Sequence, residues 1–443
     1  MGGARVISTG AGSPWAGASA SPLQVAAVAF GNALEFYDFL TYAFFAAQIG
    51  RAFFPSSDPT ASLLASLAAF GAGFLMRPVG AVVLGRIGDR HGRKPAMLLS
   101  FGLMGLGMTG LALTPSYGAI GAAAPVLAVL WRLVQGFALG GEVGPATAFL
   151  AEAAGPGRRG LFVSFQLAGQ RAAALAAGLI GLTLSHLLPA ALLDAWIWRI
   201  AFLIGALIVP LGLVLRARLT ETLSREVPPE PQAVAGRRLA RLAGLSVAIM
   251  AGGTIASYVT DYLTTYATVT LRMPGSIGFF APVASGVTGV VMAPLGGWMS
   301  DRIGRKPLML GSWAIVLLGA MPMFVLLEHS RSVLALVALS MGLTASGVVT
   351  VACLLTSLGE GLPMRLRAGG LGLMYSVAVA TFGGTTQFVV AWLTRATHSN
   401  LAPAWYLTGA AGLAFLAMLA MPETAPARPA RAPEPLSTAR IPA

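Results

Sequence analysis

The segment Asp89-Arg90-His91-Gly92-Arg93-Lys94-Pro95 occurs a second time as Asp301-Arg302-Ile303-Gly304-Arg305-Lys306-Pro307. Each copy follows a long apolar stretch and precedes another, and the two copies lie about half of the 443 residues apart. A second pair of similar segments, 152–160 and 360–369, has nearly the same offset. Two matched pairs at nearly the same offset indicate two related halves, an arrangement typical of membrane transporters that bind substrate between the halves.

The composition indicates an integral membrane protein. Apolar residues make up 56% of the chain and charged residues 10%, whereas soluble domains average about 25% charged residues. The net charge of +13 does not indicate a nucleic-acid-binding protein, because the bases lie in short loops between apolar runs rather than on one polar face. The single cysteine, Cys353, allows no intramolecular disulfide and no cysteine-based metal site.

Apolar runs of spanning length predict an all-α membrane protein with twelve transmembrane helices, since a bilayer core of about 30 Å needs about 20 helical residues. The runs are 24–47, 62–84, 96–114, 121–150, 161–186, 196–215, 242–268, 276–299, 308–327, 332–357, 369–393 and 403–421. They divide the chain into a cytoplasmic N-terminal segment at 1–22, a six-helix half at 23–215, a cytoplasmic linker at 216–241, a second six-helix half at 242–421 and a cytoplasmic tail at 422–443.

The distribution of basic residues predicts the orientation. Three of the 29 Lys and Arg residues lie within spans and five lie in loops on one side, Arg51, Arg199, Arg272, Arg331 and Arg395. The other 21 lie in segments on the side of the chain termini. Because loops rich in Lys and Arg stay in the cytoplasm, both termini are expected to be cytoplasmic, in a bacterial inner membrane.

The repeated loop resembles a motif of the major facilitator superfamily. Residues 85–94 are similar to the motif between the second and third helices of that superfamily, and 297–306 to its copy in the second half. Arg132-Leu133-Val134-Gln135-Gly136 is similar to its fourth-helix motif. The resemblance implies a fold of two pseudo-symmetric six-helix halves that works by alternating access.

Finer matches resemble the metabolite:proton symporter family within that superfamily. The matching segments are 31–39 in the first span, 74–80 in the second and 135–142 in the fourth. Substrates in that family include citrate, tricarballylate, 2-oxoglutarate, shikimate, proline and betaine. The resemblance implies uptake of such a solute with a proton as coupling ion and no other cofactor.

Two acids in the first span are candidates for proton coupling. Glu35 and Asp38 are three residues apart, so they share one face of a helix. Ionisable groups inside a membrane are costly and are functional candidates by default. Two carboxylates in a low-dielectric site disfavour the doubly charged state, which suits a proton carrier. The alternative is a fixed ion pair with Arg132 that only holds helices together.

Two arginines at mid-depth are candidates for substrate binding, because a guanidinium presents a planar fork suited to carboxylates. Arg132 is expected to bind substrate or to control a nearby acid, with structural support as the alternative. Arg171, with Gln166 and Gln170 beside it, is expected to contact an anionic substrate. The alternative for Arg171 is an ion pair with Glu35 or Asp38.

Other polar residues within spans are weaker candidates for substrate binding. Asp261 is flanked by Tyr258 and Tyr262, and a position at an outer gate or in solvent fits it as well as a site role. Asn32 and Gln387 complete this group, with polar helix packing as the alternative.

A further set of charged residues is predicted to gate the cytoplasmic side, with carboxylates that pair with bases or helix ends when that side is closed. These residues are Arg77, Asp89, Arg93, Glu142, Glu152, Asp301 and Arg305.

No catalytic motif indicates an enzyme. The phosphate-binding Gly-x-x-x-x-Gly-Lys-Ser/Thr motif of ATP-driven proteins does not occur, and His186, His329 and His398 lack metal-ligand spacing. The sequence therefore favours a monomeric proton symporter for a small organic acid such as citrate, tricarballylate or 2-oxoglutarate. The alternatives are a symporter for a zwitterion such as proline or betaine, a drug:proton antiporter, and a membrane sensor that does not transport.

Overall fold

The computed structural model describes residues 22–91, 93–140, 147, 150–151, 154, 157–217, 236–362 and 364–424. These residues form helices and short connections, with no strand among them. The N-terminal half contains α1 Pro22–Phe44, α2 Ala46–Phe53, α3 Pro59–Leu75, α4 Arg77–His91, α5 Arg93–Leu113, α6 Tyr117–Ile120, α7 Ala123–Leu139, α9 Arg159–Leu187 and α10 Ala190–Ala217.

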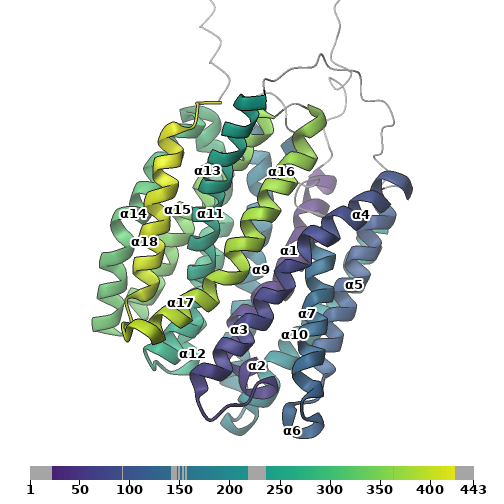
Figure 1. Cartoon of the computed structure of the whole chain (residues 1–443), viewed down its shortest axis with the longest axis vertical. Helices are drawn as coiled ribbons and strands as arrows, with labels where there is room; N and C mark the ends of the chain where they lie inside the picture. Colours follow the sequence, from purple (N-terminus) through teal and green to yellow (C-terminus); the bar gives the residue numbers. More distant parts are fainter. Residues whose placement is uncertain are drawn as a thin grey trace, which may run out of the picture.

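The C-terminal half contains α11 Gly236–Thr265, η1 Tyr266–Thr270, α12 Gly275–Gly278, α13 Phe280–Ile303, α14 Arg305–Ser330, α15 Val333–Gly361, α16 Met364–Ala378, η2 Val379–Gly383, α17 Gly384–Thr397 and α18 Ala402–Ala420. The two halves stand side by side, with α14, α15 and α18 on one flank and α4, α5 and α7 on the other (Figure 1). Two helices extend into the predicted linker at 216–241, since α10 continues to Ala217 and α11 begins at Gly236.

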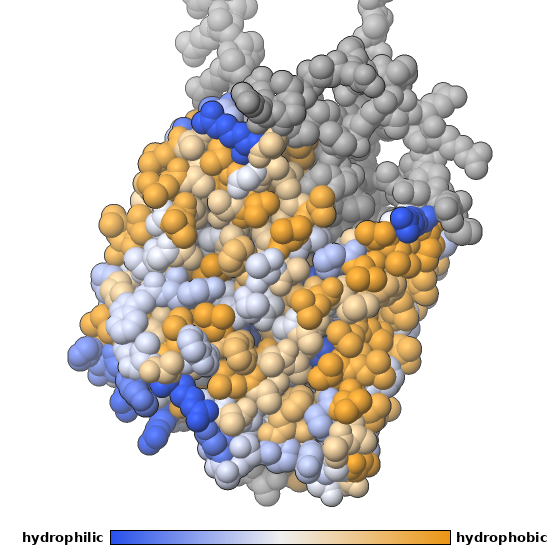
Figure 2. All heavy atoms as spheres, viewed as in Figure 1, coloured by the Kyte–Doolittle hydropathy of each residue, from blue (hydrophilic) through white to orange (hydrophobic). Residues whose placement is uncertain are grey.

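The helices have the length and surface of membrane spans. Among the described residues, eight helical stretches are long and apolar enough to cross a bilayer, and 98–113 and 123–139 are shorter apolar helices. Large apolar side chains such as Leu207, Leu318 and Leu334 are more than 70% exposed, and apolar residues cover most of the face in Figure 2. Such a surface is suited to lipid rather than to water. Each predicted span overlaps a helix or a run of consecutive helices, so the all-helical class is confirmed for the described part of the chain.

Several spans are interrupted, and one break positions a candidate residue. The second predicted span is bent between α3 and α4, where Pro78 has no N–H to donate to the preceding turn. Arg77 begins α4 at this bend. Single π-helical turns, η1 and η2, follow α11 and α16, and such turns change the direction of the side chains that follow them.

Close backbone contact joins the halves along α9 and α13. Gly178 of α9 lies against Pro282 and Val283 of α13, and a Cβ at this glycine would lie 3.0 Å from the backbone N of Val283. Gly286 of α13 lies still closer to α9, since a Cβ there would lie 2.5 Å from the backbone N of Leu175. Small residues let membrane helices approach in this way. The helices α9 and α13 therefore form a line of close contact between the two halves.

Candidate functional site

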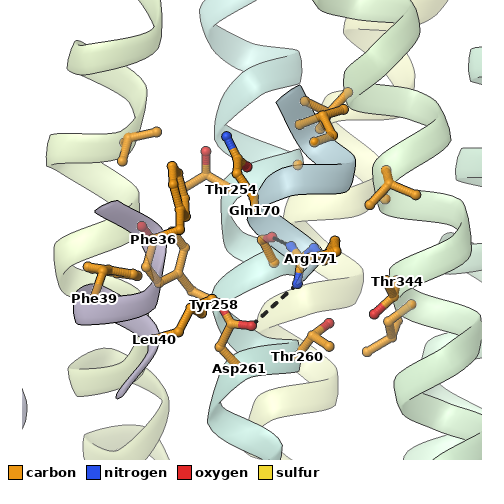
Figure 3. Close-up of a pocket in the computed structure, with 18 of the residues that line it drawn as sticks. Phe36, Phe39, Leu40, Gln170, Arg171, Thr254, Tyr258, Thr260, Asp261 and Thr344 are labelled. Atoms are coloured by element: carbon orange, nitrogen blue, oxygen red, sulfur yellow. Dashed lines mark hydrogen bonds and ion pairs between the residues drawn. The ribbon is translucent and has the colours of Figure 1, made fainter. Parts of the chain in front are cut away.

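A cavity of about 70 Å³ lies between the two halves. The N-terminal half contributes residues from α1 and α9, and the C-terminal half contributes residues from α11, α15, α16 and η2 (Figure 3). Its lining includes Phe36, Phe39, Gln170, Arg171, Thr254, Ser257, Tyr258, Thr260, Asp261, Thr344 and Tyr375. A central cavity lined from both halves is the arrangement predicted for the substrate site.

An ion pair crosses this cavity from one half to the other. Nη1 of Arg171 in α9 lies 3.4 Å from Oδ1 of Asp261 in α11, and the side chains are only 12% and 6% exposed. Figure 3 shows the two groups facing each other, between Tyr258 and Thr344. Charge-assisted hydrogen bonds usually span about 2.7–2.9 Å, so this pair is attractive but loosely made.

Hydroxyl groups hold the guanidinium of Arg171 in place. Its Nη2 donates to Oγ of Ser257 in α11, and its Nη1 donates to Oγ of Ser285 in α13 at 3.3 Å. Thr344 of α15 donates to the same Ser285 oxygen at 2.9 Å. Three helices of the C-terminal half thereby fix the position of an arginine that belongs to the N-terminal half.

The structure bears on two alternatives drawn from the sequence. The sequence left Glu35 and Asp38 as partners of Arg171, whereas the acid that faces Arg171 across the cavity is Asp261, and Asp38 pairs with Arg132. Asp261 is not in solvent, since it is only 5% exposed, and its position at an outer gate stays a prediction. The cavity instead brings together Arg171, Gln170, Tyr258 and Asp261 from the predicted set.

A second buried ion pair lies entirely within the N-terminal half. Nη1 of Arg132 in α7 is 3.5 Å from Oδ2 of Asp38, and both side chains are at most 3% exposed. Gln135 connects the two groups, because it donates to Asp38 at 3.0 Å and accepts from Arg132 at 2.6 Å. The guanidinium also lies 4.5 Å from the ring centroid of Tyr42. The pairing foreseen as the structural alternative for Asp38 is therefore present.

The helix α7 supplies none of the described residues that line the cavity, so substrate contact by Arg132 stays a prediction. Glu35 and Asn32 are buried beside Asp38 on α1 but do not line the cavity. The amide oxygen of Gln166 accepts a hydrogen bond from Thr147 at 2.7 Å.

Two further candidates lie elsewhere in the C-terminal half. Tyr262 packs in its buried core, whereas Tyr258 lines the cavity beside Asp261. Gln387 is fully buried in α17, away from the lining. Within the described residues, no three His, Cys, Asp or Glu side chains gather where a metal could bind.

An aromatic cluster adjoins the cavity and separates it from Arg77. The ring centroid of Phe39 lies 5.3 Å from that of Tyr258, and Phe74 lies 5.8 Å from Tyr258. The guanidinium of Arg77 is 4.0 Å from the centroid of Phe74 and 5.3 Å from that of Phe39. These are cation–π distances, so Arg77 is held by aromatic faces. Its gating role stays a prediction.

Charged residues join the halves at both ends of the molecule. Asp301 at the end of α13 accepts hydrogen bonds from the backbone N–H groups of Gly160 and Leu161 at the start of α9, at 2.9 and 3.0 Å. Arg305 contacts Asp301 at 2.7 Å and Glu360 at 3.1 Å. Glu142, Glu152 and the side chains of Asp89 and Arg93 lie outside the described part of the chain.

At the opposite end, Asp58 before α3 pairs with Arg395 of α17 at 2.7 Å. Sequence reasoning missed this contact, because Asp58 and Arg395 carry no motif. It also missed Ser257, Ser285 and Thr344. Only Ser257 had a usable signal, since it lies one turn before Asp261 and therefore on the same helix face.

Comparisons with known sequences give consistent results. A family model described as Major Facilitator Superfamily matches residues 28–384. The chain is 37% identical to the "Citrate-proton symporter" of Salmonella typhi, with 88% of this chain and 92% of that protein covered. It is 35% identical to the "Alpha-ketoglutarate permease" of Escherichia coli (strain K12), with 88% and 91% covered. The "Proline/betaine transporter" of the same strain is 31% identical, with 90% and 83% covered.

Among solved structures, the fold is similar to that of the xylose transporter XylE from E. coli in a partially occluded inward open conformation. The TM-score is 0.75 at 16% identity, and the match covers 91% of this chain and 98% of XylE. At this level of identity the similarity concerns the fold alone.

Proposed function

This chain belongs to the Major Facilitator Superfamily, and we propose that it is a symporter that carries a small organic acid across the membrane together with a proton. The central ion pair between Arg171 and Asp261 carries this proposal, because it places one carboxylate-binding group in a cavity lined by both halves. Two relatives of 35–37% identity that match most of the chain are named for citrate and alpha-ketoglutarate, which are both carboxylic acids. We propose citrate, tricarballylate and 2-oxoglutarate as the substrates to test.

The groups around the cavity suit such a substrate. Arg171 would bind a carboxylate through its guanidinium fork, and Gln170, Thr254 and Thr344 would offer hydrogen bonds to further oxygens. Arg132, predicted as a second substrate contact, is engaged by Asp38 and Gln135. We therefore propose that Arg132 acts on Asp38 rather than on substrate in this conformation.

Alternating access requires contacts that close each side in turn. We propose that the contact of Asp301 with the start of α9 helps to close one end, and that the ion pair of Asp58 with Arg395 helps to close the other. We propose that the Asp301 end is cytoplasmic, as the distribution of basic residues predicts. The proposed setting is a bacterial inner membrane with both termini inside and the protein acting as a monomer, with no cofactor besides the proton. Glu35 and Asp38 stay proposed proton-coupling acids.

A second candidate function is symport of a zwitterion such as proline or betaine. Aromatic rings of Phe36, Phe39 and Tyr258 line the cavity beside the Asp261 carboxylate, and such a group can bind a quaternary ammonium by cation–π attraction. The relative named for proline and betaine is more distant, at 31% identity. An organic acid is therefore the first choice.

Reconstituted protein in proteoliposomes tests both functions. Labelled citrate, 2-oxoglutarate and proline would be supplied in parallel under an inward proton gradient, with and without a protonophore. Accumulation of an acid that the protonophore abolishes is the expected result. Accumulation of proline alone would replace the organic acid by a zwitterion, and accumulation that the protonophore does not change would contradict proton coupling.

A further inference from the structure

Asp261 differs from the other buried acids in its position. Among the described residues that line the cavity, Asp261 is the one carboxylic acid and Arg171 the one permanent cation. Asp38, by contrast, accepts hydrogen bonds on both of its oxygens, from Arg132 and Gln135 inside the N-terminal half. A substrate in the cavity would therefore meet Asp261 directly and Asp38 only through other groups.

Resting on the proposed function, we propose that Asp261 takes up a coupled proton when a substrate carboxylate replaces it at Arg171. The empty carrier would keep the ion pair between the halves, and the loaded carrier would hold substrate on Arg171 and a neutral carboxylic acid at Asp261.

The geometry of Arg171 favours this exchange of partners. Ser257 and Ser285 anchor the guanidinium independently of Asp261, so it need not move when the aspartate is displaced. Its contact with Asp261, at 3.4 Å, is longer than a strong charge-assisted hydrogen bond. A substrate carboxylate that makes a closer, two-pronged contact would compete well for the same fork.

Among the described residues that line the cavity, no second cation faces Asp261 once Arg171 is taken. The other titratable groups that face the cavity are Tyr258 of α11, the helix of Asp261 itself, and Tyr375 of α16, while α13 and α15 offer the hydroxyls of Ser285 and Thr344. Arg77 lies against the rings of Phe39 and Phe74 instead. A buried carboxylate that has lost its counter-charge is strongly disfavoured, and a proton removes that cost.

Charge balance links the two binding events. The empty pair is neutral, because Arg171 is positive and Asp261 negative. The loaded Arg171–Asp261 pair keeps the same balance, because the one substrate carboxylate that contacts Arg171 replaces the aspartate charge and the aspartate gains one proton, while the other substrate carboxylates lie outside this exchange. When the proton leaves on the far side, Asp261 competes for Arg171 again and favours substrate release. Proton and substrate then stabilise the same state, which is what coupling requires.

The variant Asp261→Asn separates coupling from transport. In liposomes with the membrane potential clamped to zero, labelled citrate would be measured in two ways: accumulation driven by a gradient of one pH unit, and exchange with internal citrate at equal pH. One coupled proton gives wild type at most about tenfold accumulation under that gradient. Asp261→Asn is expected to lose accumulation while it still exchanges citrate. Asp194→Asn, the same change at an exposed ion pair with Arg51 outside the cavity, is the matched control.

The outcomes separate the two proposals. Absence of both accumulation and exchange in wild type, with 2-oxoglutarate as well as citrate, would count against the proposed function. Wild-type accumulation that Asp261→Asn matches would overturn the role of Asp261 alone. If Asp261→Asn does not fold, Asp261→Glu decides, because a retained but displaced carboxylic acid should move the pH dependence of accumulation. An unchanged pH profile in Asp261→Glu would contradict the proposal.

Discussion

The carboxylate of Asp301 accepts a hydrogen bond from the backbone N–H of Gly160 at 2.9 Å, and this contact joins the last turn of α13 to the first turn of α9. Leu161 donates a second backbone hydrogen bond to the same carboxylate at 3.0 Å. A negative charge at a helix N-terminus is favourable because the free N–H groups and the helix dipole both attract it. Arg305 and Glu360 hold the aspartate in position, so at this end of the molecule a charge on one half contacts a helix end on the other.

Asp301→Asn should open this end. Hydrogen bonds to a charged group contribute about 1.5–3 kcal/mol, so we expect the population open at this end to rise roughly tenfold or more. Spin labels at Arg158 and Ile303, both exposed, would report the distance between α9 and α13. The single cysteine, Cys353, is buried and can be replaced before labelling. An unchanged distance distribution, with Asp194→Asn as control, would argue against a gate here.

Asp58→Asn should have a smaller effect at the opposite end. Asp58 and Arg395 are 38% and 51% exposed, and exposed pairs are weak and screened by salt. We expect at most about a fivefold change in the population open at that end, and a smaller change at high salt. Labels at Ser57 and Ala396 would measure it. An effect larger than that of Asp301→Asn would mean that the ranking of the two gates is wrong.

The Asp58 pair should not make transport pH-dependent near neutrality. The backbone N–H of Thr60, helped by Arg395, holds the pKa of Asp58 below its ordinary value of 3.8. A lowered pKa means that the contribution of the pair is complete above pH 3.8 and is lost only as the pH falls through the lower value. The pH profile of transport between pH 5 and 8 should therefore be the same in Asp58→Asn and wild type. A shifted profile would show that Asp58 titrates in this range.

Asp38 and Arg132 should behave as one unit in stability. Removing one partner of a buried pair costs about 3–5 kcal/mol, because it leaves the other charge uncompensated. Asp38→Asn and Arg132→Gln should each lower the Tm in detergent, and the double variant should be less destabilised than the sum of the two. Additive losses in this double-mutant cycle would show that the contact at 3.5 Å is not an energetic pair.

Gly289→Ala should weaken substrate binding although it replaces no charged residue. A Cβ at Gly289 of α13 would meet the side chain of Arg171, which must then shift. Because overpacking typically costs about 1–3 kcal/mol, we expect the Kd for citrate to rise by roughly tenfold. Gly342→Ala is the matched control, since a Cβ there meets nothing within 4 Å. Equal affinities in the two variants would show that the position of Arg171 is not critical.

Direct removal of the cation gives the reference value for that experiment. Arg171→Gln should raise the Kd for citrate by roughly 10- to 100-fold, as expected for the loss of a hydrogen bond to a charged group. Arg171→Lys should fall between wild type and Arg171→Gln, because it keeps the charge but loses the planar fork. Binding measured by calorimetry on purified protein gives these values. An unchanged Kd in Arg171→Gln would contradict substrate contact by this residue.

The sequence predicted the helices well because membrane spans are set by local composition. Apolar runs of about 20 residues are visible in any window, and the repeated loop identified the two halves. The bend at Pro78 and the π-helical turns at Tyr266–Thr270 and Val379–Gly383 did not appear in that pattern, because they depend on packing between helices. The depth of Arg171 in the membrane was predicted by counting residues along a helix, and it stays a prediction.

The partners of the buried charges could not be predicted in the same way. Arg171 had three acids within plausible reach, and the choice of Asp261 depends on how α9 and α11 are rotated and packed. The packing of α9 also involves glycine contacts with α13, which join residues more than 100 positions apart. The ion pair of Asp38 with Arg132 was among the alternatives drawn from the sequence, because both residues lie in one half of the chain and Asp38 shares a helix face with Glu35.

The most direct measurement of proton symport is the external pH when citrate is added to lightly buffered proteoliposomes that contain the protein. If acid and proton enter together, the medium should become more alkaline in proportion to the citrate taken up, and a protonophore should abolish the signal. Citrate uptake without a pH change would contradict coupling to protons. Acidification of the medium during uptake would contradict symport and indicate exchange of citrate against protons.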